Sequence, residues 1–251
     1  MHPEYTSTLT SRLAFALRDR FEARQLLAFW LVSRSGTLPL ASYVAHLRAW
    51  GDIWAEVEVL GRSDGAHVFT DDLIFSGLLR ADCAYLTPLC PDVASECARA
   101  AEVLVRQIRT TVKAEAVAFL GVLYALERML LEARTFDDCG RMAYGLSFSG
   151  RSFWRYQVIG AEARIAELGL RLDAIPAGGR AADRIEASAR ATIAAFLDIE
   201  RTISSGTDLT ALSAHRTPPG ALVPPRPNQR TEAPSTGMGI IRGAPNGRRP
   251  R

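Results

Sequence analysis

The sequence lacks the features that would place a protein in a membrane or a secretory pathway. No run of 18 apolar residues is free of charge, so we expect no membrane-spanning helix. The first residues lack the charged start, the apolar centre and the small-residue cleavage site of a secretory signal. The sequence therefore predicts a cytoplasmic protein without a membrane span.

Motifs for common cofactors and metals are also missing. The sequence contains no G-x-G-x-x-G or P-loop spacing, no C-x-x-C pair and no Glu-x-x-His of the kind that builds helical di-iron sites. The string GRSDG at 61–65 matches G-x-S-x-G, but no predicted strand precedes it, so we interpret it as a loop. No metal site is predicted. We expect free thiols at all four cysteines, which are Cys83, Cys90, Cys97 and Cys139.

Lysine is nearly absent, and the positive charge is concentrated at one end of the chain. From Thr207 onward there are seven arginines and two acidic residues, a balance of +5, which leaves about −2 for residues 1–206 out of the total of +3. A body so close to neutral lacks the basic face that duplex nucleic acid requires. The sequence therefore predicts no nucleic-acid partner.

Composition divides the chain into two parts. Residues 207–251 hold eight of the 13 prolines together with glycine, serine and arginine. Such a segment buries too little apolar surface to offset the entropy of ordering it, so we predict a disordered tail. A proline- and arginine-rich tail is also a candidate recognition segment for another protein. Residues 1–206 are predicted to form one helical domain.

Apolar residues in the first 206 positions recur at helical spacing, and no convincing strand or internal repeat is present. Helix breaks are indicated by Gly36 and Pro39, by Gly61 and by the loop that contains Pro88. The segment 120–136 is almost wholly apolar, as expected for a helix in the middle of a bundle. The predicted helices span 6–20, 21–32, 40–60, 71–85, 91–108, 113–136, 152–172 and 181–203. The predicted fold class is all-α.

Four segments, in the same order and spacing, resemble bacterial heme oxygenases over roughly residues 9–203. LGVLYALE at 120–127 is similar to the family's central helix. TLPLASYVAHLRAWGDIWAEVE at 37–58 is similar to its second helix, with Tyr43 and Glu58 in place. YGLSF at 144–148 is similar to its GLxF segment, and GRSFWRYQ at 150–157 with ARATIAAFLDIE at 189–200 to its last two helices. The resemblance implies a heme oxygenase-like multi-helix bundle with a disordered C-terminal tail.

The resemblance also implies a heme site, and the sequence departs from the family there. Members of the family bind the iron through a histidine whose position here is Phe21, and no histidine occurs between residues 9 and 35. Glycines that let the distal helix approach the porphyrin are replaced by Arg128, Glu132 and Ala133. Because Arg128 and Glu132 are four residues apart on a predicted helix, we expect them to pair and fill the site.

A basic position of the family's pocket is retained. Arg155, in FWRYQ, matches the position that faces the heme propionates in relatives. Its guanidinium could hold a carboxylate through two parallel hydrogen bonds. His46 lies within a predicted helix and is the one candidate imidazole ligand in the body of the domain, although a single helical histidine is more often a core or surface residue.

These observations leave three functional hypotheses. The favoured hypothesis is a divergent heme oxygenase-like protein that binds another small ligand or a protein partner, with no firm cofactor. The alternative is an active heme oxygenase that opens heme to biliverdin, CO and iron, with His46 or Tyr43 as the axial ligand. The third is an interaction module that uses the tail. The oligomeric state cannot be predicted from the sequence. No catalytic residue set points to thiamin- or quinone-related chemistry on this scaffold.

Overall fold

The computed structural model describes residues 8–63, 75–90 and 95–205, and all the regular secondary structure in these ranges is helical. Between them lie a 3-10 turn at Thr87–Leu89 and a π-helical turn at Cys139–Ala143. The α-helices are α1 (Leu9–Gln25), α2 (Ala28–Arg34), α3 (Leu40–Ser63), α4 (Phe75–Leu86), α5 (Ser95–Ala114), α6 (Ala118–Leu130), α7 (Ala133–Asp138), α8 (Ser152–Asp173) and α9 (Arg180–Ser205). The predicted all-α fold class is confirmed.

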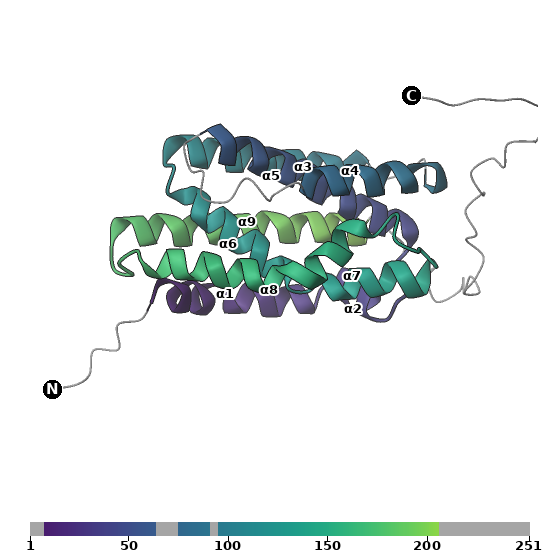
Figure 1. Cartoon of the computed structure of the whole chain (residues 1–251), viewed down its shortest axis with the longest axis horizontal. Coiled ribbons are helices and arrows are strands. Elements are labelled where there is room, and N and C mark those ends of the chain that lie inside the picture. Colours follow the sequence, from purple (N-terminus) through teal and green to yellow (C-terminus); the bar gives the residue numbers. More distant parts are fainter. Residues whose placement is uncertain (1–7, 64–74, 91–94, 206–251) are drawn as a thin grey trace, which may run out of the picture.

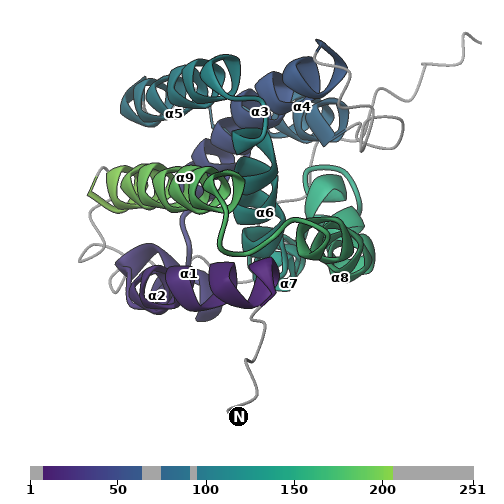
Figure 2. The same cartoon turned by 90° about the vertical axis from the view of Figure 1, so that its left-hand side faces the viewer.

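The helices form three layers, which are visible in both views (Figures 1 and 2). Helices α3, α4 and α5 lie on one side, and α1, α2, α7 and α8 lie on the other. Helices α9 and α6 run between these layers, and α9 packs against α6, α5 and α1. Among the described residues, no helix is sufficiently long and apolar to cross a membrane.

Two predicted helix boundaries near the centre of the domain are wrong. The first helix does not end near residue 20 but continues to Gln25, so Phe21 and Arg24 share one helix. The predicted central helix over 113–136 is divided among three helices. Lys113 is in the last turn of α5, and a break between Leu130 and Ala133 separates α6 from α7. At the break between α6 and α7, Glu132 has φ −95° and ψ 10°. Its side chain is held by residues of α1, which accounts for a break without glycine.

Other predictions fall partly outside the described residues. Gly61 does not end a helix, because α3 continues through it to Ser63, so the start of GRSDG is helical rather than a loop. The remainder of that string, the predicted helix starts at 6, 71 and 91, and the tail 207–251 lie outside the described residues.

Large aromatic side chains fill the interior. All four tryptophans, Trp30, Trp50, Trp54 and Trp154, are at most 1% exposed. The rings of Trp154 and Phe136 stack with their centroids 4.6 Å apart. Buried aromatic rings of this size dominate the energetics of a core, and here they join α2, α3, α7 and α8.

The crossing of α6 over α9 depends on a glycine in the LGVLYALE segment. A Cβ atom at Gly121 would lie 2.1 Å from the carbonyl oxygen of Ile185 and 2.1 Å from Oγ of Ser188. At the same crossing the Ser188 hydroxyl donates a hydrogen bond to the carbonyl of Ala118 at 2.7 Å. The two backbones therefore approach as closely as glycine allows.

Gly121→Ala is expected to lower the free energy of unfolding by about 3 kcal/mol, because the methyl group overpacks a rigid backbone contact. Urea unfolding followed by circular dichroism measures the effect. Gly77→Ala, at an exposed position of α4, is the matched control, since a Cβ there has no neighbour within 4 Å. The control is expected to gain about 0.5–1 kcal/mol from the helix preference of alanine. Equal stability of the two variants would contradict the close approach.

Candidate functional site

A buried arginine at the end of α1 organises the polar centre of the domain. The Arg24 side chain is 1% exposed. Its Nε donates to both carboxylate oxygens of Glu200 on α9, at 3.0 and 2.9 Å, and its Nη2 donates to Oε1 at 2.6 Å. Its Cζ also lies 4.3 Å from the centroid of the Trp30 ring. A bidentate pair of this kind holds both partners in one geometry.

Glu200 is fully buried and accepts hydrogen bonds from side chains of α1 and α2. The indole Nε1 of Trp30 donates to its Oε2 at 3.0 Å, in addition to the bonds from Arg24. Burial alone would raise the pKa of Glu200, but the charge of Arg24 and the hydrogen bonds from His46 and Arg24 outweigh burial and lower the pKa. The carboxylate is therefore ionised and compensated at neutral pH.

A second carboxylate reaches Arg24 from the break between α6 and α7. Oε2 of Glu132 accepts from Nη1 of Arg24 at 3.0 Å, and its Oε1 accepts from the side-chain amide of Gln25. The Glu132 side chain is 30% exposed. Burial raises the pKa of Glu132 despite the attraction of Arg24. Arg24 thus bridges α9 and the α6–α7 break, and two carboxylates share one guanidinium.

His46 of α3 lies beside this ion pair in an aromatic enclosure. It is 0% exposed, and its ring centroid lies 4.7 Å from that of Phe29 and 4.6 Å from that of Phe136. Its Nε2 is 3.3 Å from the Trp50 Nε1 donor and 3.5 Å from Oε1 of Glu200. Burial lowers the pKa of His46 below 6.5, so the ring is neutral at pH 7.

Among the described residues, His46 Nδ1 has no hydrogen-bond partner. A neutral imidazole carries one proton, so Nε2 either accepts from Trp50 or donates to Glu200. The ring therefore leaves one nitrogen unpaired within an apolar enclosure in either tautomer. An unpaired buried nitrogen is costly, and the aromatic packing around the ring compensates for part of that cost.

The structure brings Phe21 and Arg128 together across the gap between α1 and α6. Cζ of Arg128 lies 5.5 Å from the centroid of the Phe21 ring, within the range of a cation–π contact. The predicted pairing of Glu132 with Arg128 is wrong, because Glu132 binds Arg24 and Gln25 instead. The reason is the break after Leu130, which removes the i, i+4 relation between positions 128 and 132. Ala133 is buried at the start of α7.

Arg155 lies apart from this network. It is half exposed on α8, and its Nη1 is 3.7 Å from Oδ2 of Asp137. Arg151 binds the other oxygen of the same carboxylate. Asp137 therefore already supplies a carboxylate partner for Arg155 from within the chain.

Arg24 and Glu200 were not predicted as site residues, although the sequence carries a signal for both. Ile193, Phe196, Glu200 and Ile203 follow one another at core spacing along α9, and all four are buried. Arg24 likewise continues the inward face of α1 after Leu13 and Leu17. A charged residue at a core position is stable only when paired. Two such positions on different helices indicate a buried ion pair.

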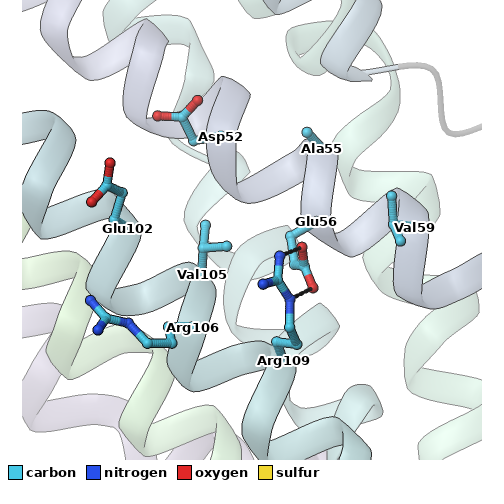
Figure 3. A pocket seen from close by; sticks show the side chains of 8 residues that line it. All are labelled: Asp52, Ala55, Glu56, Val59, Glu102, Val105, Arg106 and Arg109. Atoms are coloured by element: carbon cyan, nitrogen blue, oxygen red, sulfur yellow. Dashed lines mark hydrogen bonds and ion pairs between the residues drawn. The ribbon is translucent and has the colours of Figure 1, made fainter.

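A shallow cleft of about 650 Å³ lies between α3 and α5, outside this network. Figure 3 shows Glu56 and Arg109 joined across it, at 2.8 and 2.6 Å, with Asp52 and Glu102 to one side. Burial and the charge of Glu102 raise the pKa of Asp52. None of the predicted site residues lines this cleft.

The described residues contain no group of three or more His, Cys, Asp or Glu side chains that could hold a metal ion. All four cysteines are free. Burial raises the pKa of the Cys139 thiol to about 12, and the same effect raises that of Cys83 to about 11. These two thiols are therefore protonated at neutral pH and poor nucleophiles.

The chain is similar in structure to two solved bacterial proteins. The heme oxygenase from Leptospira interrogans is 16% identical, with a TM-score of 0.66 over 77% of this chain and 98% of that one. Heme oxygenase-1 from the cyanobacterium Synechocystis sp. PCC6803, solved in complex with heme, is 14% identical, with a TM-score of 0.67 over 82% and 99%. No protein-family model and no curated protein matches the chain.

These similarities define the class of the protein as an all-α protein with a heme oxygenase-like fold. The fold that the sequence resemblance implied is confirmed.

Proposed function

We propose that this heme oxygenase-like protein is a divergent member in which its own side chains occupy the family's heme position, so that it binds another small ligand or a protein partner. The observation that carries the proposal is the pair of contacts between α1 and the α6–α7 segment. Phe21 contacts Arg128 at 5.5 Å, and Arg24 binds Glu132 at 3.0 Å. Phe21 and Arg128, which the sequence resemblance assigns to opposite sides of the heme, therefore contact each other.

The described residues do not fit an iron porphyrin. Phe21 offers no donor atom at the position of the usual imidazole ligand. His46 is enclosed by Phe29, Phe136 and Trp154, and its Nε2 already faces Trp50 and Glu200. An iron ligand needs open space on its metal-facing side, which this ring lacks.

Tyr43 is no better placed as an axial ligand. Its hydroxyl donates to the backbone carbonyl of Gly150 at 3.1 Å within the core. Burial raises the pKa of Tyr43 well above its ordinary value of 10. Iron coordination by tyrosine uses the phenolate, which this environment disfavours.

Entry of a flat apolar macrocycle would also break the contacts of Arg24. Displacing Glu132 would break its hydrogen bonds to Arg24 and Gln25 and leave its own carboxylate without these partners, and lost hydrogen bonds to charged groups are expensive. A ligand that suits this site must instead tolerate or replace polar groups at the α6–α7 break. A polar small molecule or a partner side chain meets that requirement better than heme does.

A hemin titration tests the proposal. The purified full chain is expected to show no sharp Soret band at a 1:1 ratio and to form no biliverdin when a reductant is added. The heme oxygenase-1 from Synechocystis, which was solved with heme, serves as the positive control. A saturable 1:1 complex with turnover would contradict the proposal and establish an active heme oxygenase with an unusual ligand. His46→Ala and Tyr43→Phe would then identify that ligand.

A further inference from the structure

We propose that α8 is a self-association surface through which two copies of the chain pair in antiparallel orientation. The exposed side of α8 carries Tyr156, Ile159, Ala163, Ala166 and Leu170, at alternating spacings of three and four residues. Ile159 and Leu170 are each 76% exposed. Figure 2 shows α8 at the outer edge of its layer, with α6, α7 and α1 on its inner side.

This stripe is distinct from the face that anchors α8 in the bundle. The anchoring face is formed by Phe153, Trp154, Ala161, Leu168 and Leu172, all of which are buried. A surface helix of a monomeric protein normally needs one apolar stripe, with charged residues opposite. The second stripe on α8 has the a/d spacing with which helices pair side by side.

The sequence of α8 identifies a second copy as the occupant. Residues 159–170 read IGAEARIAELGL, and on reversal about a point between Arg164 and Ile165 three of the six residue pairs are identical and a fourth is Ile159 with Leu170. Reversal places Ile159 opposite Leu170 and Ala163 opposite Ala166. A two-fold interface requires a surface that is complementary to itself after such a reversal.

Packing in this register matches large groups with each other at the ends and small groups in the middle. Ile159 of one copy meets Leu170 of the other at both ends of the contact. Ala163 and Ala166 meet at the centre, where their size allows the helix axes to approach within the usual 8–10 Å or closer. The two bulky pairs are thus covered without a void between them.

Charge selects the antiparallel orientation. Glu162 and Glu167 lie on opposite flanks of the stripe. Parallel pairing would place Glu162 of one copy beside Glu167 of the other, which is the repulsive g–e' arrangement of a parallel coiled coil. Antiparallel pairing places Glu162 beside Gly169 and Glu167 beside Gly160 instead. Glu167 is already neutralised by Arg171 of the same copy, at 2.6 Å.

The size of the contact sets its expected strength. Helix α8 has 22 residues and is therefore about 33 Å long. One helix-on-helix contact covers less than the roughly 800 Å² per partner of a standard stable interface. We therefore expect a dimer that dissociates in the micromolar range rather than a permanent one.

Sedimentation velocity of the full chain tests the association. The mass is expected to rise from 27.4 kDa toward twice that value as the concentration increases from about 1 to 100 μM, the range in which weak complexes form. Ile159→Glu and Leu170→Glu are each expected to weaken association at least tenfold. Leu26→Glu is the matched control, because Leu26 is also 76% exposed but lies outside α8, and it is expected to leave the dimer unchanged.

Cysteine cross-linking tests the orientation. Ala166→Cys lies near the two-fold axis and is expected to cross-link with a short bis-maleimide. Tyr156→Cys residues would be about 25 Å apart along an antiparallel pair, at 1.5 Å per residue, and are expected not to cross-link. The wild-type chain with its four natural cysteines gives the background.

Three outcomes would overturn the proposal. They are a monomer at every concentration, a dimer that survives both glutamate substitutions, and cross-linking of Tyr156→Cys rather than Ala166→Cys. Circular dichroism of each variant confirms that the fold is retained. If the chain is monomeric at every concentration, the stripe is not a self-association surface. Binding of a helix from another protein would then be a different proposal.

Discussion

Arg24→Met is expected to lower the free energy of unfolding by about 3–5 kcal/mol at pH 7, because it leaves the Glu200 carboxylate buried without its cation. The methionine keeps much of the side-chain volume, so the loss of stability is due to the missing charge rather than to a cavity. Urea unfolding measures the free energy of unfolding. The loss is expected to be smaller near pH 4.5 than at pH 8, because an uncompensated buried carboxyl has a raised pKa and is destabilising once it must ionise.

Arg201→Met provides the matched control for this prediction. Arg201 is on α9, one residue after Glu200, and pairs with Asp198 at 2.7 Å with both side chains more than half exposed. Exposed pairs of this kind contribute about 0–1 kcal/mol. Equal losses in the two variants, or a loss in Arg24→Met that does not change with pH, would show that the buried network is not held together by charge.

The second large effect is a gain of heme binding in a variant that restores the family's pattern. It combines Phe21→His, Arg128→Gly, Glu132→Gly and Ala133→Gly. Removal of Glu132 still leaves Arg24 with Glu200 as its buried partner, so the central ion pair remains compensated. The variant is expected to bind hemin at least about tenfold more tightly than the wild-type chain, a difference of about 1.4 kcal/mol, with a sharp Soret band.

The same variant without Phe21→His is the control for the axial ligand. It opens the distal side but has no imidazole on α1, so its hemin spectrum is expected to stay broad. Because three glycines at or near a helix each cost about 1 kcal/mol, circular dichroism must show that both variants remain folded. Identical hemin spectra for the two variants would show that position 21 does not face the iron.

Side chains hold α1 and the α6–α7 segment together at the positions where the resemblance predicts a planar cofactor. Space between α1 and the α6–α7 segment is bridged by Phe21 with Arg128 and by Arg24 with Glu132. The break between α6 and α7 persists although glycine is absent from positions 128, 132 and 133. These side-chain contacts therefore set the spacing between α1 and the α6–α7 segment.

The fold was largely predictable from the sequence because each helix carries its own apolar face. The spacing of Tyr43, Leu47, Trp50 and Trp54 predicted α3, and all four residues are buried. The central break was not predictable in the same way. Residues 127–136 contain no proline or glycine, so nothing local marks the point at which α6 ends.

The candidate site was predictable only in part. The resemblance predicted that Phe21 stands in place of a histidine and that Arg128, Glu132 and Ala133 stand in place of glycines. The partners of those side chains were not evident. Arg128 was expected to pair with Glu132, but α6 ends between them, and Glu132 lies against α1 instead.

By itself, the sequence determined the all-α class and most helix positions, and it predicted which residues stand in place of a histidine and three glycines. Only the tertiary structure decided that Arg24 meets Glu132 and Glu200, which are 108 and 176 residues away along the chain. Apolar spacing specifies which side of a helix is buried. It does not specify which helix covers that side, and a buried charge finds its partner only after the helices have packed.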